Sequence, residues 1–183
     1  MAITKIQSES LNLADTYNFT GDVTGAGGIT QADLWRLNSS LALSAGTATT
    51  LTSWERADDG TQNAYIGNGM SVSSGIWTFP ATGIYLVNFR AYYNSSNDTT
   101  YFFSRIGGTA DDSSYDTLAE QDMSLNVISG TNYTFVTNVM HFDCQNTSTH
   151  KMRFQVYSTH AGNVGGHSSL NHTSASFVRL GDT

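Results

Sequence analysis

Apolar and polar residues alternate with a period of two along much of this chain, as is typical of strands that bury one face. The clearest stretch is residues 83–93, where Tyr85, Val87 and Phe89 share one face. The residues between them form a second, mixed face: Leu86, Asn88, Arg90 and Tyr92. This pattern predicts a strand with one face in the core and the other against solvent or a second subunit.

Further short runs of the same kind are separated by turn-forming Gly, Asn and Asp residues. They predict strands at residues 34–43, 50–55, 101–106, 118–128, 133–144, 151–159 and 173–180, with polar loops at 94–98, 107–116 and 161–172. We expect eight or nine short strands and no helix. Such an array indicates an all-β fold, and an antiparallel two-sheet jelly-roll sandwich fits the count.

The first 33 residues lack this periodicity, and they include the glycine-rich run at residues 25–28, which is typical of a flexible joint. A segment of this kind buries little apolar surface by itself and would order only against a partner. We therefore expect an N-terminal arm at residues 1–33 that serves for attachment, followed by one folded domain at residues 34–183.

Composition narrows the classes of partner. Only 13% of the 183 residues are charged, and the net charge is -7, with eight basic residues against fifteen acidic ones. No basic cluster could follow a phosphate backbone, so nucleic acid is not an expected partner. No apolar run is long enough to span a membrane, and the N-terminus lacks the apolar core of a secretory signal.

The sequence offers few candidates for catalytic or metal-binding residues. None of the five histidines has the spacing of a zinc site, and Cys144 is the single cysteine, whose apolar neighbours predict a buried thiol. The pairs Asp58–Asp59 and Asp111–Asp112 keep Ca²⁺ open as a cofactor, although turn formation is the favoured interpretation. No nucleophile elbow or acid–base pair of carboxylates is evident, so we expect no enzyme, no catalytic residue and no metal site.

The run from Gly75 to Phe89 resembles the central signature of C1q/TNF-like jelly-roll domains. In that signature an aromatic residue is followed by five residues, then Gly-x-Tyr and alternating large apolar residues. The closing run at 174–180 is similar to the small-then-aromatic last strand of the same domains. The residues that carry the resemblance are Trp77, Gly83, Tyr85, Val87, Phe89 and Phe177.

The resemblance implies a homotrimer whose subunits pack around a threefold axis. On the mixed face of residues 83–93, it makes Leu86, Arg90 and Tyr92 candidates for a subunit interface. Other partners would meet the exposed loops, where the candidate binding residues are Asn94, Asn97, Asp111, Asp112, Tyr115 and His167.

The N-terminal arm is similar to leaders that begin virion and fibre proteins of marine tailed bacteriophages. This similarity implies a structural component of a phage virion, displayed at the particle surface as capsid decoration or as a short fibre or knob. The arm would bind other virion proteins. The alternative is a receptor-binding tip of a tail fibre that recognises a host surface glycan. A secreted effector is a third interpretation, which the missing secretory signal disfavours.

Overall fold

The computed structural model describes residues 28–58, 60–62 and 65–183. Within them, thirteen strands form two antiparallel sheets, which confirms the expected all-β jelly-roll class. The one helical element among the described residues is the 3₁₀ turn Gly60–Gln62, which is far too short to span a bilayer. The strands are β1 (Ala32–Leu37), β2 (Leu41–Leu43), β3 (Thr49–Thr50), β4 (Trp54–Arg56), β5 (Ser71–Ser73), β6 (Ile76–Thr78), β7 (Gly83–Ser95), β8 (Thr99–Thr109), β9 (Asp116–Leu125), β10 (Asn132–Cys144), β11 (Lys151–Ser158), β12 (Gly162–Val164) and β13 (Ser174–Gly181).

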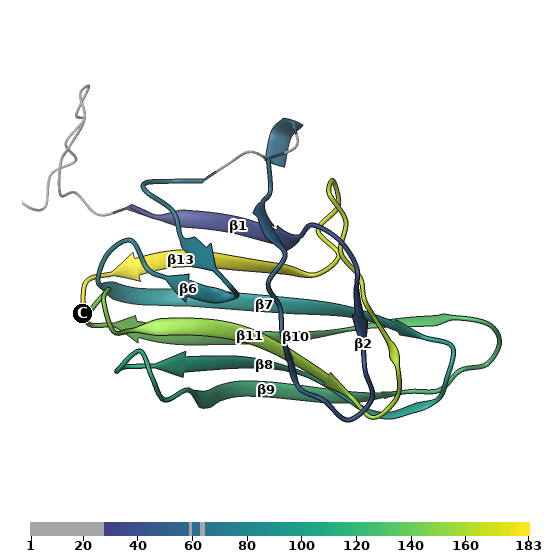
Figure 1. Ribbon diagram of the computed structural model, residues 1–183. Coiled ribbons are helices and arrows are strands. Elements are labelled where there is room, and N and C mark those ends of the chain that lie inside the picture. Colours follow the sequence, from purple (N-terminus) through teal and green to yellow (C-terminus); the bar gives the residue numbers. More distant parts are fainter. Residues whose placement is uncertain (1–27, 59, 63–64) are drawn as a thin grey trace, which may run out of the picture.

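Two sheets make the sandwich (Figure 1). Sheet A has the order β4-β1-β13-β7-β10, and β12 with β2 continues beside the last residues of β7. Sheet B has the order β5-β6-β11-β8-β9, with β3 also paired to β11. In the described part of the chain β10 pairs only with β7 and β9 only with β8, so these two strands are free edges that lie beside each other.

The long strands form because their side chains alternate as a half-buried sheet requires. In β7 every second residue from Tyr85 to Tyr93 is buried, which is the face that the sequence pattern predicts for the core. The same alternation on β11 buries Met152, Phe154 and Val156 from the opposite sheet. The core therefore lies between the two inward faces.

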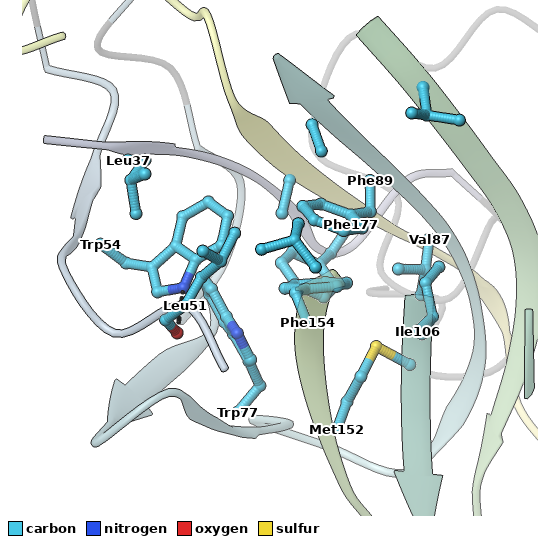
Figure 2. Close-up of a cluster of buried hydrophobic side chains, with 14 of the residues drawn as sticks. Leu37, Leu51, Trp54, Trp77, Val87, Phe89, Ile106, Met152, Phe154 and Phe177 are labelled. Carbon is cyan, nitrogen blue, oxygen red and sulfur yellow. Dashed lines mark hydrogen bonds between the residues drawn. The ribbon is translucent and has the colours of Figure 1, made fainter. Parts of the chain in front are cut away.

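Aromatic rings fill the centre of this core (Figure 2). Trp77 is fully buried, and its ring centroid lies 5.3 Å from that of Trp54, 5.5 Å from Phe154 and 5.0 Å from Phe177. Phe89 stacks on Phe154 at 4.5 Å. Because β6, β4, β7, β11 and β13 each supply one ring, this cluster joins both sheets, and edge-to-face pairs add stability beyond the buried area. All six residues of the C1q/TNF-like signature are buried.

A buried carboxylate fixes the edge of sheet A. Asp33 accepts hydrogen bonds from Arg56 Nε and Nη2 at 2.9 and 3.0 Å, from Trp35 Nε1 at 2.8 Å and from the Met70 amide at 2.8 Å. The Arg56 guanidinium also lies against the rings of Trp35 and Tyr65. Asp33 thus links β1 to β4 and to the segment that leads into β5.

Several element bounds differ from those expected. The loop expected at 107–116 is shorter, because β8 continues to Thr109: Gly107 and Gly108 pair with β11, and a side chain at 108 would strike Leu118 and Phe142. The loop expected at 161–172 contains the short strand β12, which is stabilised by pairing with β2 and β7.

The start of the domain also differs in detail. Strand β1 begins at Ala32, two residues before the expected domain boundary. Leu34 is only half-buried, because it alternates with the inward residues Asp33 and Trp35 and points to the outward face. The rest of the expected arm, residues 1–27, lies outside the described residues.

Candidate functional site

The outward face of sheet A, on the side away from the core, is the largest candidate surface. On β7 the three residues expected at a subunit interface, Leu86, Arg90 and Tyr92, all point to this face and are half-buried. They alternate with fully buried residues, so the strand itself dictates that they share one side. The structure therefore brings together the candidate interface residues that the mixed face predicted.

Strand β10 adds a row of exposed apolar side chains to this face. Tyr133, Phe135 and Val139 are 61%, 59% and 58% exposed, whereas the residues between them, Val136 and Asn138, are buried. In the ladder Phe135 is opposite Tyr92 and Val139 is opposite Asn88, so the two rows lie side by side. We did not assign this row to an interface from the sequence, although its alternation in residues 133–144 was a sufficient signal.

On the other side of β7, strand β13 continues the face with small and aliphatic residues. Val178 is opposite Leu86, and Ser176 is opposite Asn88 and also Leu34 of β1. From here on, "the outward face" means the surface formed by the outward residues of β1, β13, β7 and β10: Leu34, Ser176, Val178, Leu86, Asn88, Arg90, Tyr92, Tyr133, Phe135 and Val139. Among these ten residues Arg90 is the only charged one, while Arg36 of β1 and Asp143 of β10 lie on the same side of the sheet toward its margins.

The guanidinium of Arg90 contacts an aromatic ring. Its Cζ lies 4.5 Å from the centroid of Phe135, a cation–π contact between β7 and β10. Its Nε is buried without a hydrogen-bond partner, and among the described residues the guanidinium forms no salt bridge. A partner that supplied an acceptor here would satisfy a buried donor.

A row of neighbouring rings, stacked for Tyr92 and Tyr133 and tilted for the two histidines, extends from the outward face toward the loop before β13. The centroid of Tyr92 lies 5.9 Å from that of Tyr133 and 5.0 Å from that of His172, and His172 lies 5.5 Å from His167. The Nδ1 atom of His167 accepts hydrogen bonds from the backbone amides of Ser169 and Leu170. This candidate binding residue therefore stabilises the turn in which it lies. The proton of its neutral imidazole is therefore on Nε2.

The other predicted partner-binding residues lie at two opposite ends of the sandwich. Asn94 and Asn97 flank the turn between β7 and β8, whereas Asp111, Asp112 and Tyr115 follow the far end of β8. The structure therefore does not bring the predicted loop residues together into one site.

The Asp111 carboxylate is used within its own loop. It accepts hydrogen bonds from Thr109 Oγ1 at 2.7 Å and from the amides of Ser114 and Ser113 at 2.8 and 2.9 Å. These bonds, the one from Thr109 first, hold the pKa of Asp111 well below its usual value. The carboxylate forms a turn, which is the interpretation favoured over Ca²⁺ binding, and Arg153 covers Tyr115 with Cζ 4.5 Å from the ring centroid.

The remaining candidate groups give no reactive centre in the described residues. No group of three or more His, Cys, Asp or Glu side chains there could hold a metal ion. Asp58 lies 3.0 Å from Arg36, and Asp59 is outside the described residues. The Cys144 thiol is buried, as expected, and burial raises its pKa to about 11, so it stays protonated at neutral pH.

Comparison with known proteins identifies the fold. No protein-family model matches the sequence, and a comparison with curated proteins finds no match. Among solved structures, the Eiger TNF of S. frugiperda superposes with a TM-score of 0.58 at 17% identity, covering 85% of this chain and 96% of that chain. Murine APRIL at pH 8.0 gives 0.59 at 14% identity, covering 82% and 98%. The domain therefore has a TNF-like jelly-roll fold.

Proposed function

We propose that this protein is a structural component of a bacteriophage virion: a homotrimeric TNF-like jelly roll displayed at the particle surface, anchored by its N-terminal arm. It serves as capsid decoration or as a short fibre or knob. The TNF-like fold supports the trimer, because the resemblance to C1q/TNF-like domains implies subunits that pack around a threefold axis. The similarity of the arm to phage leaders supports the location, and residues 1–27 of that arm lie outside the described residues.

The observation that carries the assembly is the outward face. Phe135 and Val139 expose more than half of each side chain in one row, next to the half-buried Leu86 and Tyr92, while Tyr133 lies at the end of that row and stays outside the proposed contact. A contiguous apolar surface of this kind on a soluble chain marks an interaction site. Arg90 is the only charged residue among the ten that define this face, so covering them would cost little in charge desolvation.

A trimer also fits the shape of the sandwich. The outward face is broad, whereas the adjacent edge formed by β9 and β10 is narrow. When the edge of one subunit meets the face of the next, two different surfaces are in contact, and such a heterologous contact closes into a ring when the rotation is right. We propose no reaction for this assembly.

The native mass in solution tests the assembly directly. We expect a particle of about three times 19.8 kDa by native mass spectrometry or light scattering at low micromolar concentration. A stable monomer at that concentration would contradict the proposal, and a dimer would replace the threefold arrangement with a twofold one.

A second experiment tests the location. Purified phage particles should contain the protein at high copy number, and the purified full chain should bind saturably to particles that lack it. Saturable binding to host cells, with no binding to such particles, would instead favour the receptor-binding tip. Absence of the protein from purified particles would overturn both virion assignments.

A further inference from the structure

The end of the sandwich at the β7–β8 turn carries a hollow of about 320 Å³. Four segments meet there: β2, the β7–β8 turn, the loop before β10, and β12. Its polar lining comes from Asn94, Ser96, Asn97, Thr131 and Asn163, and Leu43 contributes an apolar side chain. No charged residue lines it.

The hollow presents amide and hydroxyl groups that the protein does not use itself. Within the described residues, the side chains of Ser96, Asn97 and Thr131 form no hydrogen bond to another protein group. The amides of Asn163 and Asn94 make one long contact of 3.4 Å with each other, which leaves most of their donors and acceptors open. Such a set suits an uncharged ligand with several hydroxyl groups and disfavours a charged one.

The wall of the hollow is rigid beneath these groups. Ser95 is buried, and its Oγ donates to the Ala161 carbonyl at 3.0 Å while it accepts the Asn97 amide at 3.0 Å. Below it the hydroxyl of the buried Tyr93 lies 2.8 Å from Ser158 Oγ. Two sides of the hollow are thus tied together before any ligand arrives, which lowers the entropic cost of binding.

An aromatic ring lies beside the hollow. Tyr133 is directly opposite Asn94 in the β7–β10 ladder, and neighbours in such a ladder have Cβ atoms about 5 Å apart. Its ring is 61% exposed and is supported from behind by Tyr92. An exposed tyrosine ring offers an apolar surface with a polar tip, next to uncharged amides and hydroxyls.

We infer that this hollow, which we call the end hollow, binds a neutral saccharide unit of a glycan, with Asn97, Thr131 and Asn163 bonding its hydroxyls and Tyr133 stacking on the sugar ring. Pockets of this kind combine an apolar surface with a few placed polar groups. The inference deepens the proposed function and rests on it, because a displayed virion protein would meet glycans on the host surface.

The position of the end hollow suits display. The described chain enters at β1, whose Ala32 is level with Leu86 of β7, whereas the hollow surrounds Ser95, nine residues further along the same strand. At about 3.3 Å per residue the two ends are roughly 30 Å apart. In Figure 1 β1 begins at the left, near the C-terminus, and the loop between β9 and β10 lies at the right. In a trimer three end hollows would face the same way, which multiplies a weak affinity through avidity.

Saturation-transfer NMR on the full-length protein tests the site with a fixed panel of methyl glycosides. The neutral probes are those of glucose, galactose, mannose, rhamnose and N-acetylglucosamine, and the charged comparators are glucuronic acid and N-acetylneuraminic acid. We expect at least one neutral probe to bind in the millimolar range and both acids to bind more weakly. Asn97→Ala and Thr131→Val should each weaken that binding about fivefold, the loss of one hydrogen bond.

The exposed Asn38, which does not line the hollow, provides a matched control, since Asn38→Ala should leave binding unchanged. Three results overturn the site: no neutral probe binds at tens of millimolar, the acids bind more tightly than every neutral probe, or binding is unchanged in both hollow variants. Native mass and particle content decide the proposed function separately. If the protein is a trimer present in particles but binds none of the neutral probes, only the site is refuted. If it is a monomer that binds them at the end hollow, only the assembly is refuted.

Discussion

The Arg90 guanidinium lies over the ring of Phe135, with its Cζ 4.5 Å from the ring centroid, and this contact joins β7 to the free-edge strand β10. Both residues lie on the outward face, where Phe135 is 59% exposed. The contact holds an exposed aromatic ring in place, so the apolar row of β10 is an ordered surface.

Phe135→Asp should separate assembly from folding. In the isolated subunit the new carboxylate would lie next to Arg90, so the fold should be retained. In the proposed trimer the same charge would be buried at the interface, and we expect the subunit dissociation constant to rise roughly tenfold or more. Native mass spectrometry across a dilution series measures the shift, with far-ultraviolet circular dichroism to confirm the fold.

Ile128→Asp is the matched control, because Ile128 is also apolar but lies in the β9–β10 loop and is 95% exposed. It should leave the mass unchanged. If Phe135→Asp stays as trimeric as the parent, the outward face is not the interface.

Gly162 allows the close approach of β12 to Tyr93. A Cβ at residue 162 would lie 2.5 Å from the Tyr93 hydroxyl oxygen, which is fixed by its contacts with Ser158 and Thr99. We therefore expect Gly162→Ala to lower the free energy of unfolding by about 1–3 kcal/mol. Urea denaturation measures this.

For comparison, a Cβ at Gly181 would meet nothing within 4 Å, so Gly181→Ala should change the stability by less than about 0.5 kcal/mol. Equal effects of the two substitutions would show that the approach of Gly162 to Tyr93 is not a constraint on the fold.

Asp33→Ala removes the acceptor shared by four residues, since the Leu34 amide also donates to it. The Asp33 side chain is 2% exposed, and its loss would leave the Arg56 charge without a counter-ion and the Met70 amide and Trp35 indole without their acceptor. The hydrogen bonding of the Arg56 guanidinium to Asp33, in which Arg56 donates, is also the main reason that the pKa of Arg56 is raised. We expect a loss of about 3–5 kcal/mol by urea denaturation.

The double variant Asp33→Ala with Arg56→Met should recover part of that loss, because no uncompensated cation remains. If the double variant is less stable than the sum of the two single changes predicts, the pair is not coupled in the way the contacts indicate.

Asp111 makes the stability of the folded state depend on pH in the acid range. Because hydrogen bonds lower its pKa in the folded state, its contribution to stability is present above the unfolded pKa of about 4 and is lost as pH falls through the folded value. Asp111→Ala should therefore be less stable than the parent at about pH 7, and the difference should shrink toward about pH 2. Thermal midpoints across this range measure it.

Asp116→Ala is a suitable control, since Asp116 is exposed and makes no hydrogen bond through its side chain within the described residues. Its difference from the parent should stay small at every pH. A difference for Asp111→Ala that is constant down to the lowest pH would contradict the role of the carboxylate in its turn.

The sequence is enough to predict the long strands, because apolar and polar residues alternate with a period of two in a strand that buries one face. Residues 83–93 and 133–144 are the clearest cases: both are strands, and residues 83–93 have the expected inward face. The pairing of β7 with β10 could not be read in the same way, since its register depends on which strands meet in space. The short strand β12 was missed because three residues carry no periodicity, and the single strand expected at 34–43 is divided into β1 and β2.

The end hollow shows the same limit for a site. Loop composition was enough to single out Asn94 and Asn97. Thr131 and Asn163 reach the same hollow from segments far along the chain, and nothing in the sequence near either residue signals that they meet. The approach of Tyr133 to Asn94 likewise follows from the β7–β10 register alone.

The two free edge strands have a consequence for solubility at high concentration. An unpaired edge is a template on which further strands can add, and growth of that kind leads to aggregates. On β9 the exposed side chains include Asp116, Glu120 and Asp122, so a second β9 approaching edge to edge would bring carboxylates against carboxylates. A chain with few charges thus keeps several of them on the strand where uncontrolled stacking of copies would begin, which opposes aggregation of the domain at high concentration.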